Sequence, residues 1–156
     1  MALSRSALRL LSSRAAFMPV RGYADMSLTF AAPSQVLYNG ANVKQVDVPS
    51  FSGSFGILPA HVPTLAVLKP GVVTVYEQDG SAKKIFVSSG TVTVNEDSSV
   101  QLLAEEAVPV EQLDISAAKE LLAQAQNELA SAGNDKDKAK AAIAIEVTEA
   151  LVKACE

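Results

Sequence analysis

The sequence has few of the residues that most often carry catalytic or metal chemistry. Its 156 residues include no tryptophan, one cysteine and one histidine. The lone Cys155 excludes an intrachain disulfide framework and leaves a thiol-based metal site without its other ligands. His61 is the single histidine, so sites that need two or more imidazoles are excluded as well. We expect no metal and no cofactor.

Two further absences concern membranes and phosphates. A membrane-spanning helix needs roughly 20 consecutive apolar residues, and no such run occurs. Neither G-x-x-x-x-G-K-[ST] nor G-x-G-x-x-G is present, so no phosphate-binding loop is encoded. The adjacent acids Glu105 and Glu106 fall where a strand is ending, where neighbouring side chains point to opposite faces. We therefore expect a protein that is not an enzyme, has no catalytic residues and does not span a membrane.

The first 23 residues contain no acid, although they carry four arginines and four serines. Wound as a helix, they place apolar residues on one face, namely Leu3, Ala7, Leu10 and Phe17. This composition is typical of a mitochondrial targeting segment, with a disordered basic tail as the alternative. We expect residues 1–23 to be cleaved, with the mature chain beginning near Ala24 in the mitochondrial matrix.

Cleavage would make the chain strongly acidic. The whole sequence has 13 basic and 17 acidic residues, a net charge of −4. Loss of the four N-terminal arginines leaves nine basic residues against 17 acids, a net charge of −8. Nucleic acids and anionic lipids are bound through basic patches, so both are poor candidates for partners.

The pattern from residue 24 to residue 109 is that of β-structure. Short runs rich in valine, isoleucine and threonine alternate with turns such as Asp79-Gly80, at a spacing of about ten residues. We expect an antiparallel β-sandwich of about eight to ten strands. Residues 35–38 and 44–48 are predicted as separate strands around Asn39-Gly40, with Lys44, Val46 and Val48 on one face.

From residue 110 to residue 156 the pattern changes to that of a helical hairpin, which makes the fold α+β in two parts. Asp114 or Ser116 can cap a first helix that runs through Glu128. Its predicted apolar stripe is Ala118, Leu122, Ala125 and Leu129. After a turn at residues 133–135, the second helix reaches about Lys153. Its predicted stripe is Ile143, Val147, Ala150, Leu151 and Ala154.

The alanine-rich stripes leave the hairpin with a stability problem. Two such helices bury little apolar surface against each other, because alanine supplies helix propensity but almost no apolar area. The hairpin must therefore dock on its own sandwich, on another protein, or on each at different times. A hairpin packed permanently on the sandwich remains one of these alternatives.

The segment from Gly53 to Pro63 is the most distinctive in the chain. It has two glycines, two prolines and His61 among apolar residues, with no acid. Glycine and proline at these positions predict a stiff loop rather than a regular element. No nucleophile–base pair is present, so we expect a shaped surface, with a structural or interface role for His61.

This segment, G-x-F-G-I-L-P-x-H-x-P, resembles the motif near the start of the small rotor-stalk subunit of F-type ATP synthases, called delta in mitochondria and epsilon in bacteria. The resemblance extends over essentially all of the chain after residue 24. Together with the targeting segment, the resemblance is to the mitochondrial form of this subunit. Further matching segments are Met26–Phe30, Val46–Ser50, Leu68–Gly71, Phe86–Gly90, Leu113-Asp114 and Glu149–Ala154.

The resemblance implies a mechanical role. The subunit would lie between the gamma shaft and the membrane ring of c subunits, peripheral to the matrix side of the inner membrane, and turn with both, so that proton flow drives ATP synthesis. The sandwich side and hairpin would hold the gamma subunit and the small mitochondrial epsilon subunit. The residues expected to face the c-ring are Gly53, Ser54, Phe55, Gly56, Leu58, Pro59 and His61.

One departure from the family concerns nucleotides. Some bacterial relatives bind ATP through I/L-D-x-x-R-A at the start of the hairpin, where this chain has Leu113, Asp114, Ala117 and Ala118. Ala117 replaces the arginine that would meet the nucleotide charge, so we expect no ATP binding. Two other functions stay open: a free-standing acidic matrix adaptor or chaperone with a docking hairpin, and a small-ligand β-barrel enzyme, which would need a deep polar pocket.

Overall fold

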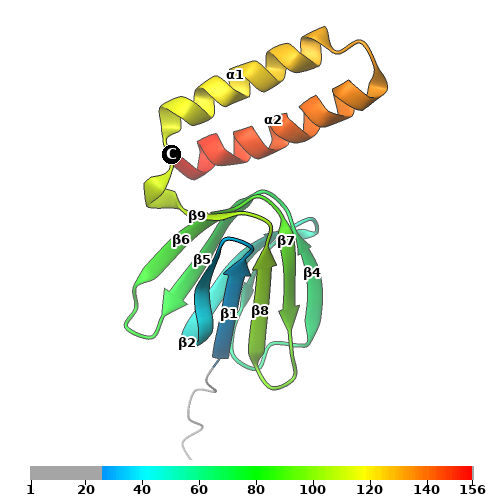
Figure 1. The fold of residues 1–156 in the computed structure, drawn as a ribbon. Helices are drawn as coiled ribbons and strands as arrows, with labels where there is room; N and C mark the ends of the chain where they lie inside the picture. Colours follow the sequence, from blue (N-terminus) through cyan, green and yellow to red (C-terminus); the bar gives the residue numbers. More distant parts are fainter. Residues whose placement is uncertain (1–25, 156) are drawn as a thin grey trace, which may run out of the picture.

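The computed structural model describes residues 26–155, where nine strands precede a short 3-10 turn and two helices (Figure 1). The predicted targeting segment, residues 1–23, lies outside these residues. The strands are β1 (Met26–Ala32), β2 (Gln35–Ser50), β3 (Gly53–Ile57), β4 (Thr64–Leu68), β5 (Gly71–Glu77), β6 (Ala82–Val87), β7 (Gly90–Val94), β8 (Ser99–Ala104) and β9 (Ala107–Pro109). They are followed by η1 (Val110–Gln112), α1 (Ile115–Ser131) and α2 (Asp135–Cys155).

The strands form the predicted β-sandwich. One layer has the order β1-β8-β7-β4, and the other is formed by β2, β5, β6 and β9. Strand β3 pairs with the edge of β2 that is opposite to β5. Strand β2 pairs with β1 along its first half and with β5 along its second, so it joins the two layers. The pairs are antiparallel except for β1 and β8, which run parallel, a departure from the all-antiparallel expectation.

Strand β2 is one 16-residue strand and not the two strands expected around Asn39-Gly40. The chain continues through Gly40 because glycine tolerates its φ of +62°, and the pairing with β1 shifts register there. In the pairing of β2 with β5, a further register shift lies at Lys44. The extra residue of this bulge lets Val43 and Val46 both face the core and leaves Lys44 exposed, so the predicted face was wrong for Lys44.

The sandwich is filled by large apolar side chains from both layers. Alternate residues of β1, β7 and β8 point inward, as the period of two requires. Phe30, Leu28, Leu68 and Leu102 have no exposed surface. Each such side chain contributes about 1.5–3 kcal/mol when it leaves water. The sandwich therefore has a complete core of its own.

Helix α1 begins as predicted at an Asp114 cap, whose Oδ1 accepts hydrogen bonds from Ser116 N at 2.8 Å and Ala117 N at 3.4 Å. Its inward stripe is shorter than expected: Ala118 and Ala125 are buried, whereas Leu129 is 38% exposed.

The face of α2 that packs on α1 carries Ala141 and Thr148. Ile143, expected in the apolar stripe of α2, is 64% exposed, so the prediction was wrong for this residue, whereas the other four residues of the stripe are partly buried. The apolar residues of α2 encircle much of the helix, and the periodic pattern alone did not decide between its two apolar faces. Thr148 stays inside because its hydroxyl donates to the Ala144 carbonyl at 2.8 Å.

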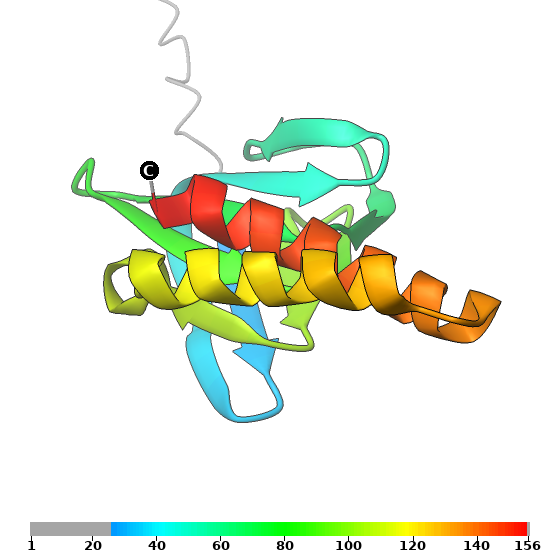
Figure 2. The same cartoon turned by 90° about the horizontal axis from the view of Figure 1, so that it is seen from above.

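The hairpin lies across one end of the sandwich, with α2 closer to the strands than α1 (Figure 1). Seen from above, the two helices run side by side, and the turn between them extends beyond the edge of the sandwich (Figure 2). The hairpin therefore meets the sandwich where the hairpin begins and where it finishes, at η1 and at the last turns of α2, and not along the full length of its helices.

Candidate partner-binding surface

The first half of the distinctive segment is a strand, and the expectation of a loop from Gly53 onward was wrong. Residues 53–57 form β3, which pairs with residues 46–50 of β2. Ile57 is fully buried and Phe55 is half-buried against the core, so the inward side chains and the ladder with β2 outweigh the loop preference of the glycines. Ser54, opposite Pro49, is exposed.

The two glycines of β3 serve different purposes. Gly53 has a φ of +120°, which only glycine adopts readily, and it follows the turn at residues 51–52. Gly56 instead makes room, because a Cβ there would lie 2.8 Å from Asp47 Oδ1. That carboxylate accepts a hydrogen bond of 2.6 Å from Gln45 Nε2 on the neighbouring strand.

The true loop is residues 58–63, between β3 and β4. His61 N donates to the Leu58 carbonyl at 3.1 Å, which closes a tight turn. Ala60 has a φ of +61°, and its amide donates to Ser98 Oγ at 3.0 Å. Leu58 and Val62 are 53% and 73% exposed. The loop therefore presents apolar side chains on a backbone that the hydrogen bonds of Ala60 and His61 hold in place.

His61 is half-buried, and its ring interacts with residues of the same segment. Its Nδ1 lies 2.8 Å from the Val62 carbonyl oxygen, which can only accept, so Nδ1 carries the hydrogen. The ring centroids of His61 and Phe55 are 6.1 Å apart. Between residues 26 and 155 no group of three metal-ligating side chains comes together. What the loop offers is shape and apolar contact.

The loop and the hairpin lie at opposite ends of the sandwich. Strand β4 leads from the loop at Thr64 to Leu68, and the corner that follows, Lys69-Pro70, meets α2.

Neither helix within the described part of the chain is long and apolar enough to cross a membrane.

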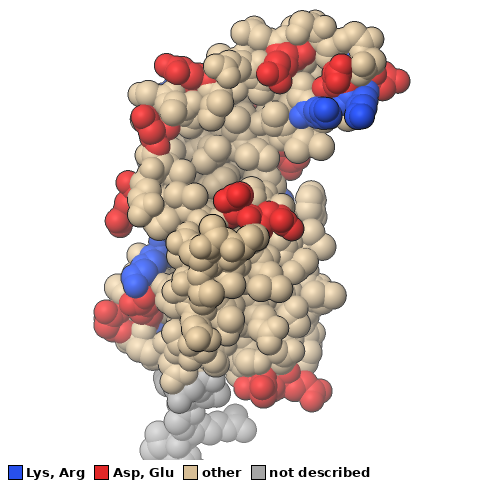
Figure 3. Space-filling view, in the orientation of Figure 1, with Lys and Arg blue, Asp and Glu red and all other residues tan. Residues whose placement is uncertain are grey.

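The outer face of β1, β8, β7 and β4 has no charged residue between its turns. Its side chains are Thr29, Ala31, Gln101, Leu103, Thr91, Thr93, Leu65 and Val67. Leu65 is 74% exposed, and Leu103 and Val67 are each more than half exposed. Figure 3 shows the part of this face over β1, β8 and β7 as an uncharged area with acidic groups near its two ends. We call it the uncharged face.

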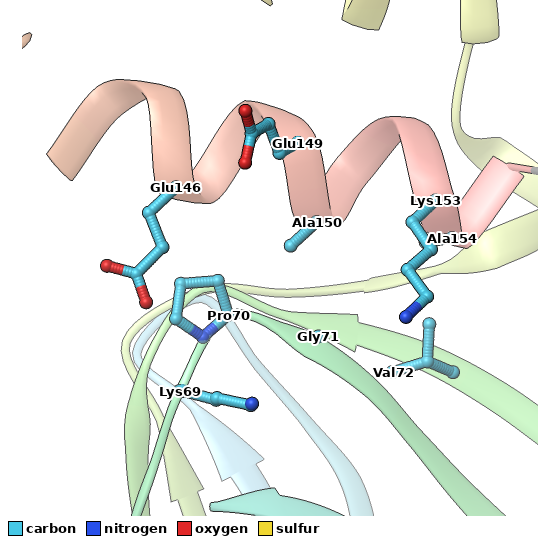
Figure 4. Close-up of a pocket in the computed structure, with 9 residues that line it drawn as sticks. All are labelled: Lys69, Pro70, Gly71, Val72, Glu146, Glu149, Ala150, Lys153 and Ala154. Atoms are coloured by element: carbon cyan, nitrogen blue, oxygen red, sulfur yellow. The ribbon is translucent and has the colours of Figure 1, made fainter. Parts of the chain in front are cut away.

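A groove of about 430 Å³ separates α2 from the corner between β4 and β5 (Figure 4). The sandwich contributes residues 69–72, and Ala150 is among the α2 residues opposite. The Glu146 side chain points toward Pro70, whereas Glu149 points away from the sandwich. The single ion pair found among the described residues lies elsewhere, so no salt bridge joins α2 to the sandwich at this junction.

The positions of the bacterial nucleotide motif have structural uses here. The Asp114 carboxylate caps α1, and Ala118 is a buried residue of that helix. Ala117, in the arginine position, is exposed. The absence of nucleotide binding stays a prediction.

Sequence reasoning missed two arrangements that depend on the fold. Ser98 reaches Ala60 from a distant turn, 38 residues away. Tyr38 donates to Glu77 Oε1 at 3.1 Å, and Lys83 Nζ lies 2.7 Å from the same oxygen. The hydrogen bonds from Lys83 and Tyr38 lower the pKa of Glu77, and the bond to Glu77 raises the pKa of Lys83. No local sequence signal links these residues.

The model of the family described as ATP synthase, Delta/Epsilon chain, beta-sandwich domain matches residues 25–110. The mitochondrial ATP synthase subunit delta of Caenorhabditis elegans is 49% identical over 130 residues, which cover 83% of this chain and 79% of the relative. The chain belongs to the ATP synthase delta/epsilon family. The subunit delta of Saccharomyces cerevisiae is 42% identical over 142 residues, 86% of this chain and 88% of the relative.

Solved structures have the same fold as this delta/epsilon-family chain. A chain of the Euglena gracilis mitochondrial ATP synthase, in a structure of OSCP, F1 and c-ring, superposes with a TM-score of 0.80 at 24% identity, covering 90% of this chain and 87% of that chain. A chain of the Tetrahymena thermophila central stalk and c-ring gives a TM-score of 0.66 at 15% identity, covering 84% and 96%. The resemblance to mitochondrial delta subunits drawn from the sequence is thus confirmed.

Proposed function

We propose that this chain is a non-catalytic central-stalk subunit of the mitochondrial ATP synthase, on the matrix side of the inner membrane. It couples the c-ring to the gamma shaft, so that proton flow drives ATP synthesis. The observation that carries the proposal is the arrangement of surfaces: an exposed apolar loop at one end of the sandwich and the helical hairpin, with exposed apolar side chains, at the other. Family membership does not favour a free-standing adaptor.

The loop end is the part assigned to the c-ring. Leu58 and Val62 are exposed on a loop with no charged residue, and the hydrogen bonds of Ala60 and His61 fix its backbone. A preformed apolar loop loses little conformational entropy when it docks, so it suits a contact that must carry torque.

The uncharged face and the hairpin are assigned to the gamma subunit and the small mitochondrial epsilon subunit. Leu65, Val67 and Leu103 expose apolar surface beside threonines, the composition of a face that a partner covers. The exposed Ile143 on α2 adds a further apolar contact at the hairpin.

The test is site-specific photo-crosslinking in the assembled synthase. A photoreactive residue in place of Val62, which is 73% exposed, should form an adduct with the c subunit. The matched control is the same residue in place of the exposed Ser34, in the β1–β2 turn at the hairpin end, which should form none. Adducts of Val62 with other proteins only, or equal c-subunit adducts from both positions, would contradict the assignment.

A further inference from the structure

Two strained residues of the sandwich meet each other. Ala60 and Ser98 are the non-glycine residues with positive φ between residues 26 and 155, at +61° and +64°. They lie in different turns, and the Ala60 amide donates to Ser98 Oγ at 3.0 Å. A left-handed backbone is unfavourable for residues with a Cβ, so it persists where the surrounding structure imposes it. Such residues cluster where shape is needed.

We propose that Ser98 is a positioning residue, which holds loop 58–63 in the conformation that docks on the c-ring. The proposal rests on the function proposed above. It assigns a role to a residue of the β7–β8 turn, a segment outside the distinctive motif.

The β7–β8 turn is built to hold Ser98 still. Ser98 N donates to the Asn95 carbonyl at 3.2 Å, and Asn95 N donates to the Ser99 carbonyl at 2.9 Å. Asp97 Oδ1 accepts from Ser99 N at 2.9 Å and from Ser99 Oγ at 2.6 Å. These bonds fix the backbone position of Ser98 relative to the sheet, because the turn closes directly onto β7 and β8.

The hydrogen bond to Ser98 in turn fixes the apolar side chains of the loop. Ala60 lies midway between Leu58 and Val62, the two exposed apolar residues, and next to the turn closed by His61 N and the Leu58 carbonyl. Release of the Ala60 amide would let its backbone leave the left-handed region. Leu58 and Val62 would then sample several orientations, and docking would carry the entropy cost of ordering them.

The decisive variant is Ser98→Gly, because glycine accepts a φ of +64° and lacks the CH2OH side chain that carries the accepting hydroxyl. In the isolated full chain, amide hydrogen exchange at Ala60 should become about five- to tenfold faster, the effect of one lost hydrogen bond. Exchange in the core strands should not change. Ser81→Ala is the matched control: it removes a turn serine hydroxyl that bonds Asp79 at 2.7 Å and does not touch the loop.

The same variants are then assembled into the synthase. Ser98→Gly should lower retention of the c-ring with the stalk after mild detergent treatment, and Ser81→Ala should not. Ser98→Asn should restore both retention and slow exchange, because asparagine tolerates the left-handed region and offers a carbonyl oxygen as acceptor.

The outcomes separate the two proposals. Unchanged exchange at Ala60 in Ser98→Gly would overturn the positioning role. Faster exchange with normal ring retention would also overturn it, and the function would still stand if Val62 crosslinks to the c subunit. Without that crosslink the proposed function itself fails. Faster exchange, reduced retention and rescue by Ser98→Asn would together support the proposal.

Discussion

The sandwich and the helical hairpin are stabilised in different ways. The sandwich encloses Phe30, Leu28, Leu68 and other large side chains with no exposed surface. The buried residues of the hairpin are Ala118, Ala125, Ala141 and Thr148, which contribute little apolar area. Larger hairpin residues such as Leu121 and Ile143 remain 48% and 64% exposed. One part of the chain completes its own core, and the other leaves several large apolar side chains exposed.

This difference fits the two tasks that we assign. A part that transmits torque must keep its shape without help, and the sandwich has the buried area for that. A part that holds other subunits needs accessible apolar surface, which the hairpin retains. Helices of this length are marginal alone in water, so we expect the hairpin to become fully stable only in the complex.

The largest expected effect is the loss of a core aromatic. Phe30→Ala should lower the free energy of unfolding by about 3–5 kcal/mol, because the ring is fully buried and the sandwich cannot close around the cavity. Urea titrations would measure this. Ile143→Ala in the hairpin is the counterpart: it should be neutral or stabilising by a few tenths of a kcal/mol, since alanine is the better helix former. Equal losses of unfolding free energy in the two variants would contradict the difference between sandwich and hairpin.

A second pair of variants compares two glycines. A Cβ at Gly90, which begins β7, would lie 2.2 Å from the Leu103 carbonyl oxygen and 2.9 Å from Ala104 Cα. Gly90→Ala should therefore force β7 and β8 apart at a cost of about 1–3 kcal/mol. Gly133, between the helices, has nothing within 4 Å. Gly133→Ala should stabilise by about 0.4–1 kcal/mol, through the unfolded chain. Thermal melts that rank the two variants the other way would contradict the packing described for this edge.

Removal of the α1 cap should affect only the hairpin. Asp114→Ala removes the acceptor of two backbone amides and should cost about 0.5–2 kcal/mol in helix stability. Asp114→Asn keeps an acceptor and should lose little. Amide exchange read residue by residue should show the change in α1 and α2 and none in β7 or β8. A matching change in the sandwich would mean that the two parts unfold as one unit.

The smallest effect is a pH dependence within the sandwich. The pKa of Glu77 is lowered by hydrogen bonds from Lys83 and Tyr38, so its stabilising contribution is present at neutral pH and is lost as the pH falls below its ordinary value of 4.5. Burial and Glu77 raise the pKa of Tyr38, and Glu77 raises that of Lys83. Their contributions are therefore lost at alkaline pH. The melting temperature of Glu77→Gln should decline less steeply in acid than that of the parent chain. An unchanged decline would show that the interaction of Glu77 with Lys83 and Tyr38 is not its cause.

Much of the fold follows from local patterns. The change of period near residue 110, the Asp114 cap and the turn at Asp79-Gly80 are short-range features, and each appears where the sequence indicates. The targeting segment and the partner assignments are different, because the first lies outside the described residues and the second depend on other proteins.

The errors have tertiary causes. Glycines suggested a loop at residues 53–57, but pairing with β2 and burial of Ile57 make it a strand. Phe55 is half-buried, so Phe55→Ala should cost less than the loss of a fully buried ring. The bulge at Lys44, the exposed side of Ile143 and the contact from Ser98 to Ala60 all depend on which distant segments meet. A periodic pattern within one segment cannot specify them.

The difference between sandwich and hairpin can be measured directly by hydrogen exchange on the isolated chain and on the assembled synthase. The account predicts slow exchange in β1, β7 and β8 in both samples. In α1 and α2 it predicts fast exchange in the isolated chain and slow exchange in the complex. Equal protection of the hairpin in the two samples would contradict the claim that the sandwich is complete on its own and the hairpin is completed by its partners.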